Sequence, residues 1–321
     1  MDVIITNDSA LEFWRLHRRS RVNFVFRKCL RKPPCESSIS TVLHHVETWN
    51  LTMPLDIMVG EKGSRRPSKA ILPHVCSNPL PDNAILEASN GLYVISPELC
   101  FFQMAGRYSL AELIALGNEL CGSYSLPPIP SAGIDQDVSN QPLYNLPKLT
   151  NVKKLKAFAA RMEGWLGYRL ALKALQYIAD DSASPMETIL FILLTLPYRY
   201  GGFALPAPEL NGRIDPEYRM ARFSGGSFYR GDLLWRSAKT VVEYDSDMEH
   251  TGPDRIASDA IRRNDLALCG FTEITVTKSQ VQDPKLLEKI ARQIAARIGK
   301  ELRYKNPAFA KTQSGLYRAL F

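Results

Sequence analysis

A proline-rich segment at residues 124–150 divides this 321-residue chain into two blocks. The segment holds five prolines and shows little hydrophobic periodicity, which is typical of a linker or a long surface loop. A chain of this length has room for two domains. We therefore predict a smaller α+β domain at residues 1–123, a linker at 124–150 and a second domain at 151–310.

The first block alternates short apolar runs with turn residues, as a compact α+β module does. Ser9 and Glu12 have the spacing of a capping box, which predicts a helix from about residue 9 to residue 20. Residues 96–124 have apolar positions at helical spacing and predict one or two helices. Between these helices the sequence predicts strands at 22–26, 54–59, 70–75 and 91–96.

The second block begins with helical periodicity over residues 151–180. Ser184 and Glu187 again have capping-box spacing around Pro185, so a helix of about three turns is expected next. The remaining elements predicted here are a β-hairpin of 228–235 with 239–245, a helix at 254–271, a strand at 272–277 and a helix at 283–303.

Charge is distributed unevenly along the chain. Residues 1–150 carry 14 Lys and Arg against 14 Asp and Glu, whereas residues 151–321 carry 26 against 19. A basic domain favours a polyanionic partner, because Lys and Arg release counterions from a phosphate backbone when they bind it. The sequence contains neither an apolar run of membrane-spanning length nor a start typical of a signal peptide, so we expect a cytoplasmic protein without membrane contact.

The stretch KTVVEYDSDMEH, residues 239–250, runs a β-branched strand into closely spaced acidic residues. In the predicted hairpin, Asp232 would stand near Glu243, and Asp245 would share the face of Glu243 because strand side chains alternate. Carboxylates this close raise one another's pKa, so a fold seldom gathers them without a cation or a catalytic purpose. Oxygen ligands at this density suit Mg²⁺.

Five separated elements of the second block resemble the PD-(D/E)XK nuclease superfamily, and within it the domains related to the very-short-patch mismatch repair endonuclease. They are the Ser184–Glu187 cap, GDLLW, VVEYDSDMEH, the Arg-rich helix before Gly270-Phe271, and the TEITVT strand with its final helix. The resemblance covers roughly residues 182–303. It implies a restriction-endonuclease-like mixed sheet flanked by helices.

The same resemblance implies the roles of individual residues. Asp232, Glu243 and Asp245 would bind Mg²⁺, with Mn²⁺ as a possible substitute, and Glu187 would complete the acidic group. His250 would transfer protons, and Arg255, Arg262 and Arg263 would contact DNA phosphates. The chain departs from the family pattern at Ser246, where Gly is usual, and adds Asp247 and Glu249.

Two function classes follow from these observations. The first is a Mg²⁺-dependent endonuclease acting on DNA, and the second is a non-catalytic DNA-binding regulator that keeps the nuclease fold. The first block, over about residues 40–122, resembles the C-terminal region of AbiEi-type antitoxins, which implies a toxin or defence-system partner. Ordinary structural roles also stay open, since Glu187 fits a helix cap and the arginines fit a solvated helix face.

Overall fold

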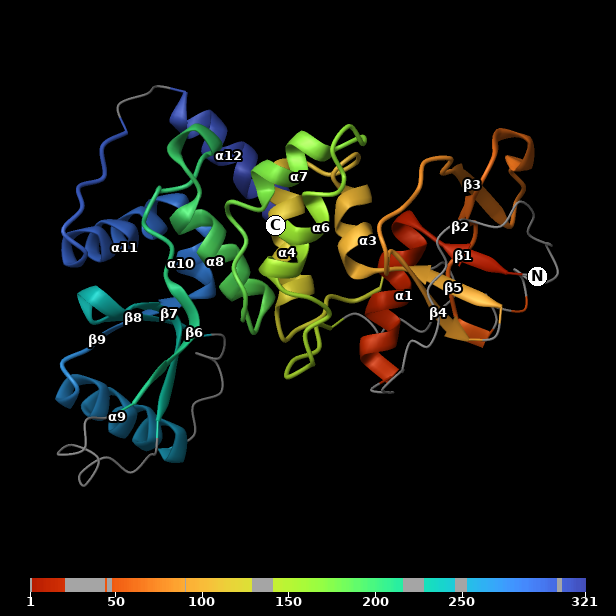
Figure 1. Ribbon diagram of the computed structural model, residues 1–321. Helices are drawn as coiled ribbons and strands as arrows, with labels where there is room; N and C mark the ends of the chain where they lie inside the picture. Colours follow the sequence, from red (N-terminus) through yellow and green to blue (C-terminus); the bar gives the residue numbers. More distant parts are fainter. Residues whose placement is uncertain are drawn as a thin grey trace. The chain divides into compact units, whose positions relative to one another are not determined.

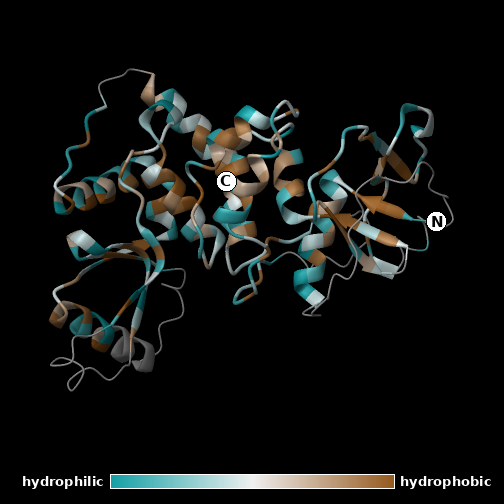
Figure 2. Ribbon diagram, in the orientation of Figure 1, coloured by the Kyte–Doolittle hydropathy of each residue, from teal (hydrophilic) through white to brown (hydrophobic). Residues whose placement is uncertain are grey.

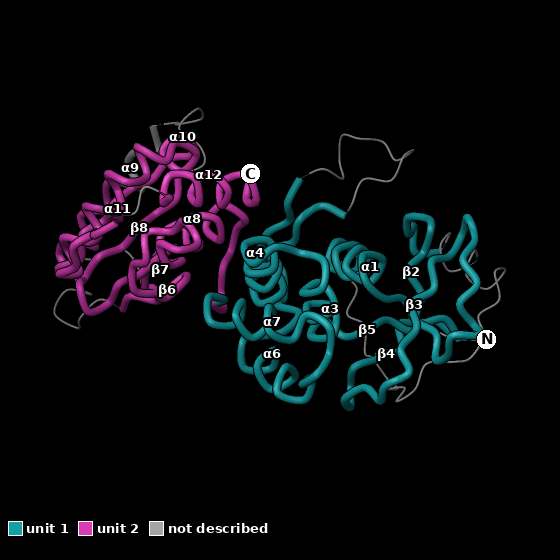
Figure 3. Tube along the Cα trace, turned by 90° about the horizontal axis from the view of Figure 1, so that it is seen from above, with its two compact units in different colours: residues 1–178 teal, residues 179–321 magenta. Residues whose placement is uncertain are grey.

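The computed structural model describes residues 2–20, 44, 48–89, 91–128, 141–215, 228–245, 253–304 and 308–321, with only the backbone described at 253–259. The chain forms two compact units, residues 1–178 and 179–321 (Figures 1 and 3). Each unit has a mixed β-sheet flanked by helices, so the predicted α+β class is confirmed. Among the residues described, no helix combines the length and the apolar character needed to cross a membrane.

Unit 1 is built on a five-stranded sheet with the order β3-β2-β1-β5-β4. Its strands are β1 (Val3–Ile5), β2 (Leu55–Val59), β3 (Ile71–Val75), β4 (Ile85–Ser89) and β5 (Leu92–Ile95). Three of the predicted strands are therefore confirmed as β2, β3 and β5, while β1 and β4 were not predicted. The strand predicted at 22–26 lies outside the described residues.

Helix α1 (Asn7–Ser20) begins before its predicted cap. The Ser9 hydroxyl accepts the backbone N–H of Asp56 at 2.9 Å, and the Glu12 carboxylate accepts the backbone N–H of Thr52 at 3.0 Å. These two side chains therefore tie the helix to β2 and the loop before it. The predicted capping box was wrong, because both polar groups are used in tertiary contacts. Helices α3 (Pro97–Met104) and α4 (Leu110–Cys121) confirm the two helices expected after β5.

The boundary between the units falls after Ile178, not at the predicted linker. Helices α6 (Val152–Ala159) and α7 (Tyr168–Ala174) pack against α3 and α4, so residues 151–178 belong to unit 1. The described ends of the proline-rich segment also pack there, since Arg18 donates hydrogen bonds to the carbonyl oxygens of Tyr124 and Pro147. Proline content alone did not distinguish a linker between domains from a segment whose described ends pack within one unit.

The helical periodicity of residues 151–180 is divided between two helices, α6 and α7. Gly167 has a φ of 82°, a backbone conformation that residues other than glycine rarely adopt. A Cβ at this position would also lie 2.8 Å from the backbone carbon of Ala105, so the close approach of the two segments requires glycine. The glycine thus allows α7 to turn back onto α4.

The new boundary also changes the assignment of charge. Residues 1–178 carry 20 Lys and Arg against 15 Asp and Glu, whereas residues 179–321 carry 20 against 18. The expectation that the second domain holds all of the positive excess was therefore wrong. Most of that excess comes from residues 151–178, which fold with unit 1.

Unit 2 is built on a four-stranded sheet with the order β6-β7-β8-β9. Its strands are β6 (Glu209–Ile214), β7 (Tyr229–Trp235), β8 (Thr240–Asp245) and β9 (Thr272–Thr277). Its helices are α8 (Pro185–Thr195), α9 (Pro253–Leu268), α10 (Lys278–Gln282), α11 (Pro284–Arg297) and α12 (Phe309–Leu320). The predicted hairpin is confirmed as β7 and β8, whereas β6 and α12 were not predicted.

Helix α9 connects β8 to β9, which pair in parallel. Parallel neighbours need such a crossover, because a tight hairpin can join only antiparallel strands. Leu266 of α9 packs with Ile214, Leu234 and Val241 of the sheet, which fixes the helix against β6, β7 and β8. Helix α8 is hydrophobic along most of its length (Figure 2) and buries Leu190, among others. This packing holds the first turn of α8 and the middle of α9 near the polar ends of β7 and β8.

Candidate functional site

Four carboxylates of unit 2, from α8, β7, β8 and β9, form one group, in which the charges of Asp232 and Glu273 raise the pKa of neighbouring carboxylates. They are Glu187, Asp232, Glu243 and Glu273, and we call them the acidic cluster. Burial is the largest cause of the raised pKa in the first three, and the neighbouring negative charges raise it further in Glu187 and Glu243. The cluster therefore concentrates negative charge in a poorly solvated place.

Asp232 and Glu243 form the centre of the cluster. Leu233 of β7 stands opposite Val242 of β8, and one step further along this register Asp232 faces Glu243. The Asp232 carboxylate accepts the backbone N–H of Tyr244 at 2.7 Å, which fixes it across the hairpin. Burial, together with the charge of Asp232, raises the pKa of Glu243 from about 4.5 to about 8. The hairpin thus brings the first two predicted metal ligands together.

Glu187 joins the cluster from the first turn of α8. Its backbone N–H donates to the Ser184 hydroxyl at 3.1 Å, which confirms Ser184 as the helix cap. Its carboxylate accepts the Ala183 N–H at 3.0 Å and the Asn211 side-chain amide at 2.8 Å. Burial and the charge of Asp232 raise the pKa of Glu187 to about 7. The residue therefore takes part in both the helix start and the acidic cluster.

Arg262 of α9 reaches into the cluster. Its guanidinium donates to the Glu243 carboxylate and, at 2.8 Å, to the backbone oxygen of Arg230. Burial alone would lower the pKa of Arg262, but Glu243, Glu273 and Asp232 raise it. The predicted arginine on α9 is therefore beside the acidic residues in the structure, where its charge offsets part of theirs.

A small pocket of about 100 Å³ opens next to the cluster. Asp245, at the end of β8, lines it together with Glu243 and Thr275, and the β8–β9 register sets Asp245 opposite Thr277. Arg263 lines the pocket as well and donates to Glu273 at 3.1 Å, with its own side chain 58% exposed. The pocket is large enough for a few water-sized groups, which suits a phosphate or hydrated ion rather than a whole nucleotide.

Strands β7 and β8 approach each other closely beside Asp232. Gly231 precedes it, and a Cβ on Gly231 would lie 2.6 Å from a methyl carbon of Val241 and 3.6 Å from the Glu243 carboxylate. Real Cβ atoms do not approach other atoms as closely as the first of these distances. Glycine is therefore required for β7 and β8 to bring their carboxylates this near to each other.

Two predicted site residues lie wholly or partly outside the described residues. His250 falls in the segment 246–252, and of Arg255 only the backbone, within α9, is described. Sequence reasoning also missed Glu273 and Asn211. The alternation of TEITVT could have indicated that Glu273 shares a face with Thr275 beside Glu243, whereas Asn211 lies in a segment expected to be a loop.

The donor set of the cluster is chemically suited to a divalent cation. Carboxylate oxygens are the ligands that Mg²⁺ prefers, and a bound cation would oppose both the burial and the repulsion that raise the pKa values of Glu187 and Glu243. Within the described parts of the chain, no group of three or more His, Cys, Asp and Glu side chains is arranged to hold a metal ion. The predicted magnesium site at Asp232, Glu243 and Asp245 therefore stays a prediction.

Comparisons of the chain with protein-family models, with curated proteins and with solved structures found no match. The resemblance of the second block to PD-(D/E)XK nucleases and that of the first block to AbiEi-type antitoxins therefore stay predictions. The acidic cluster, with Arg262 paired to Glu243 and Arg263 to Glu273, is the feature from which a function can be argued.

Proposed function

We propose that unit 2 is a Mg²⁺- or Mn²⁺-dependent endonuclease that hydrolyses phosphodiester bonds in DNA. One observation carries the proposal: Asp232 and Glu243 are set against each other at the end of a hairpin, and the pKa of Glu243 is raised to about 8. The pKa of Glu243 stays raised although Arg262 pairs with it, and strongly perturbed carboxylates are typical of sites that bind a cation or transfer protons.

Asp232 and Glu243 would hold the cation, with Asp245 as the third ligand predicted from the sequence. Mg²⁺ commonly uses one or two carboxylates and completes its coordination with water and substrate phosphate, which fits this small donor set. A bound ion would supply a water of lowered pKa and would neutralise charge on the phosphate. The raised pKa of Glu243 supports this, because such a carboxylate gains most from a nearby positive charge.

Glu187 and Arg262 would contribute the remaining chemistry among the described residues. With a pKa of about 7, Glu187 exchanges a proton near neutral pH, which suits a general base. Arg262 donates from one nitrogen to Glu243 and to a backbone oxygen, and a guanidinium has further donors that match phosphate oxygens. His250 keeps its predicted role in proton transfer.

DNA as the substrate rests on the resemblance of the sequence, and a cytoplasmic location, which was expected from hydropathy, is part of the same proposal. The mixed sheet of β6 to β9 with flanking helices agrees with the fold that this resemblance implies. The nearly balanced charge of residues 179–321 offers less support than expected, since non-specific affinity for nucleic acid grows with the number of basic groups that contact phosphate. A toxin or defence-system partner would follow from the antitoxin-like first block.

The second candidate is a non-catalytic DNA-binding regulator that keeps this fold. The pairing of Arg262 with Glu243 favours it, because an arginine can hold acidic residues together without any metal ion. The two candidates differ in what removal of Asp232 would do. The nuclease would lose its activity, whereas the regulator would keep its DNA affinity and have no cleavage to lose.

The decisive experiment is cleavage of supercoiled plasmid with Mg²⁺ or Mn²⁺ by the wild type, by Asp232→Asn and by Glu288→Gln. Glu288 lies on the surface of α11 and pairs with Arg292, so it serves as a matched carboxylate outside the cluster. We expect metal-dependent nicking by the wild type and the Glu288 variant and none by the Asp232 variant. Absence of wild-type cleavage on plasmid, mismatched and branched DNA, with DNA binding intact, would favour the regulator.

A further inference from the structure

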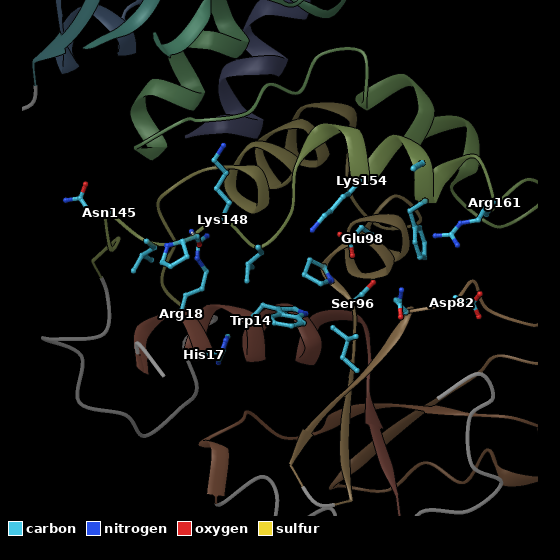
Figure 4. Close-up of a pocket in the computed structure, with 18 of the residues that line it drawn as sticks. Trp14, His17, Arg18, Asp82, Ser96, Glu98, Asn145, Lys148, Lys154 and Arg161 are labelled. Carbon is cyan, nitrogen blue, oxygen red and sulfur yellow. The ribbon is translucent and has the colours of Figure 1, made fainter. Parts of the chain in front are cut away.

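Unit 1 contains a pocket of about 870 Å³ that the proposed nuclease does not use. Its volume is within the range of small-molecule sites, which is roughly 300–1,000 Å³. The pocket is lined from α1, from the start of α3, from residues 144–149 and from α6 with the residues after it (Figure 4). All of the lining residues belong to unit 1.

The inner wall of the pocket is apolar and fixed in position. Trp14 and Phe158 are almost completely buried, and Pro97 at the start of α3 lies in the same wall. The indole N–H of Trp14 donates to the backbone oxygen of Ile95 at 3.0 Å, which fixes the ring. Because these three side chains are themselves covered, the apolar surface that a ligand would meet comes from other lining residues that are half-buried or exposed, among them Leu86, Leu149 and Ala157.

The rim of the pocket is basic. Lys148, Lys154 and Arg161 line it with exposed side chains, and the Arg161 guanidinium lies 5.6 Å from the centre of the Phe158 ring. Figure 4 shows Lys154 and Arg161 across the pocket from Trp14. Lys154 and Arg161 come from residues 151–178, the segment that supplies most of the positive excess of the chain. The rim can therefore attract an anionic group at the mouth of an apolar pocket.

Arg18 also lines the pocket, but its role is structural. Its guanidinium donates to the backbone oxygens of Glu119, Gly122, Tyr124 and Pro147 at 2.5 to 3.2 Å. These bonds hold the end of α4 and the two described ends of the proline-rich segment together. The cations that face a ligand are thus those of the rim.

Two carboxylates complete the lining. Glu98 accepts the hydroxyl of Thr150 at 2.5 Å, and Asp82 lies next to Asn83 at the turn before β4. A ligand that carries only negative charge would use the rim and be repelled by these carboxylates. A ligand with hydroxyl groups as well as an anionic group would donate hydrogen bonds to them. The lining thus combines an apolar surface that can contact a ring, carboxylates that can accept hydrogen bonds from hydroxyl groups, and cations that can bind an anion.

We propose that this pocket binds a nucleoside phosphate, with the phosphate at Lys154 and Arg161, the base against the apolar wall and the sugar hydroxyls toward Asp82 and Glu98. Inorganic phosphate would leave the apolar wall uncovered, and a purely apolar ligand would bring no anion to Lys154 and Arg161. The phosphate can belong to a free nucleotide or to the 5′-phosphorylated end of a nucleic-acid strand, which present the same chemistry to the rim. Unit 1 would then be a nucleotide-responsive module.

The test is equilibrium binding of the full-length protein to five kinds of ligand: AMP, GMP, a 5′-phosphorylated oligonucleotide, adenosine and ribose 5-phosphate. All measurements are made in the presence of a chelator, so that no divalent cation takes part in binding. Lys154→Ala and Arg161→Ala probe the rim. Lys153→Ala is the matched control, because Lys153 is an exposed neighbour on α6 that does not line the pocket. These substitutions remove exposed side chains, and thermal unfolding of each variant verifies the fold.

We expect a mononucleotide to bind, adenosine and ribose 5-phosphate to bind more weakly, and each rim variant to lower the affinity about tenfold while the Lys153 variant does not. Binding of the oligonucleotide but not of the mononucleotides would assign the phosphate to a strand end. Absence of binding by every phosphate ligand, or affinity that neither rim variant changes, would overturn the proposal. Plasmid cleavage by unit 2 plays no part in this outcome.

Discussion

Units 1 and 2 both bury charged side chains, but they balance those charges differently. In unit 1, Arg15 donates to both carboxylate oxygens of Glu119, at 2.9 and 2.7 Å, and Glu119 also accepts the Leu126 N–H at 2.9 Å. In unit 2, Arg262 pairs with Glu243, but burial and the charges of Asp232 and Glu273 still raise the pKa of Glu243 to about 8. A matched buried pair serves the fold, whereas a surplus of buried carboxylate charge marks a site that can accept a cation.

The largest expected effect is on the matched pair of unit 1. Glu119→Gln keeps the shape and the contact with Leu126 but leaves the Arg15 charge without its counter-ion, with the Glu119 side chain only 2% exposed. We expect the free energy of unfolding of unit 1 to fall by about 3 kcal/mol. Urea unfolding, monitored by circular dichroism, measures this change. A loss below about 1 kcal/mol would mean that the pair is not the balanced contact described above.

Removal of a carboxylate from the acidic cluster should raise the free energy of unfolding at high pH, the opposite of the effect expected in unit 1. Because folding raises the pKa of Glu243 from about 4.5 to about 8, its contribution to stability is complete below about pH 4.5 and is lost as the pH rises through about 8. A glutamine at position 243 cannot ionise, so the Glu243→Gln variant does not lose stability in this way as the pH rises. We expect the variant to be more stable than the wild type by about 2 kcal/mol at pH 9 in chelator, and similar to it at pH 4.5.

Urea unfolding of both proteins across this pH range checks that expectation. Glu288→Gln is a control of opposite sign: hydrogen bonds from Tyr304 and Arg292 lower the pKa of Glu288, so this variant should gain no stability over the wild type at high pH. A Glu243 variant that is less stable than the wild type at every pH would show that Arg262 already balances the cluster.

The smallest effect is expected at the edge of the cluster. Arg263 pairs with Glu273, but its side chain is 58% exposed, so solvent screens the interaction. Arg263→Ala should change the free energy of unfolding by less than about 0.5 kcal/mol. A larger loss of stability in urea unfolding would show that Arg263 neutralises Glu273 in a balanced ion pair. Unit 2 would then resemble unit 1 more closely in how it compensates its buried charges.

Much of the centre of the site could be predicted because it depends on local pattern. The hairpin was indicated by two apolar runs about four residues apart, and once its strands pair, Asp232 must face Glu243. The helix cap at Ser184 and the position of Arg262 on α9 also follow from short-range spacing. These elements needed no knowledge of how distant segments meet.

The features that were missed depend on distant contacts. Strand β6 contains Gly212 and an Asn211 with a φ of 49°, so its local sequence is typical of a loop and only pairing with β7 makes it a strand. Residues 151–178 join unit 1 because α6 and α7 pack on α3 and α4, which no linker composition reveals. Glu273 enters the cluster only through the parallel pairing of β8 with β9.

Calorimetric titration of the metal-free protein with Mn²⁺ at pH 7.5, using the wild type, Asp232→Asn and Glu288→Gln, tests most directly whether the acidic cluster binds a cation. We predict a divalent-cation site in the wild type and in the Glu288 variant that is absent from the Asp232 variant. Failure of the wild type to bind the ion, or binding that Asp232→Asn leaves intact, would contradict the claim that the acidic cluster of unit 2 is a cation site.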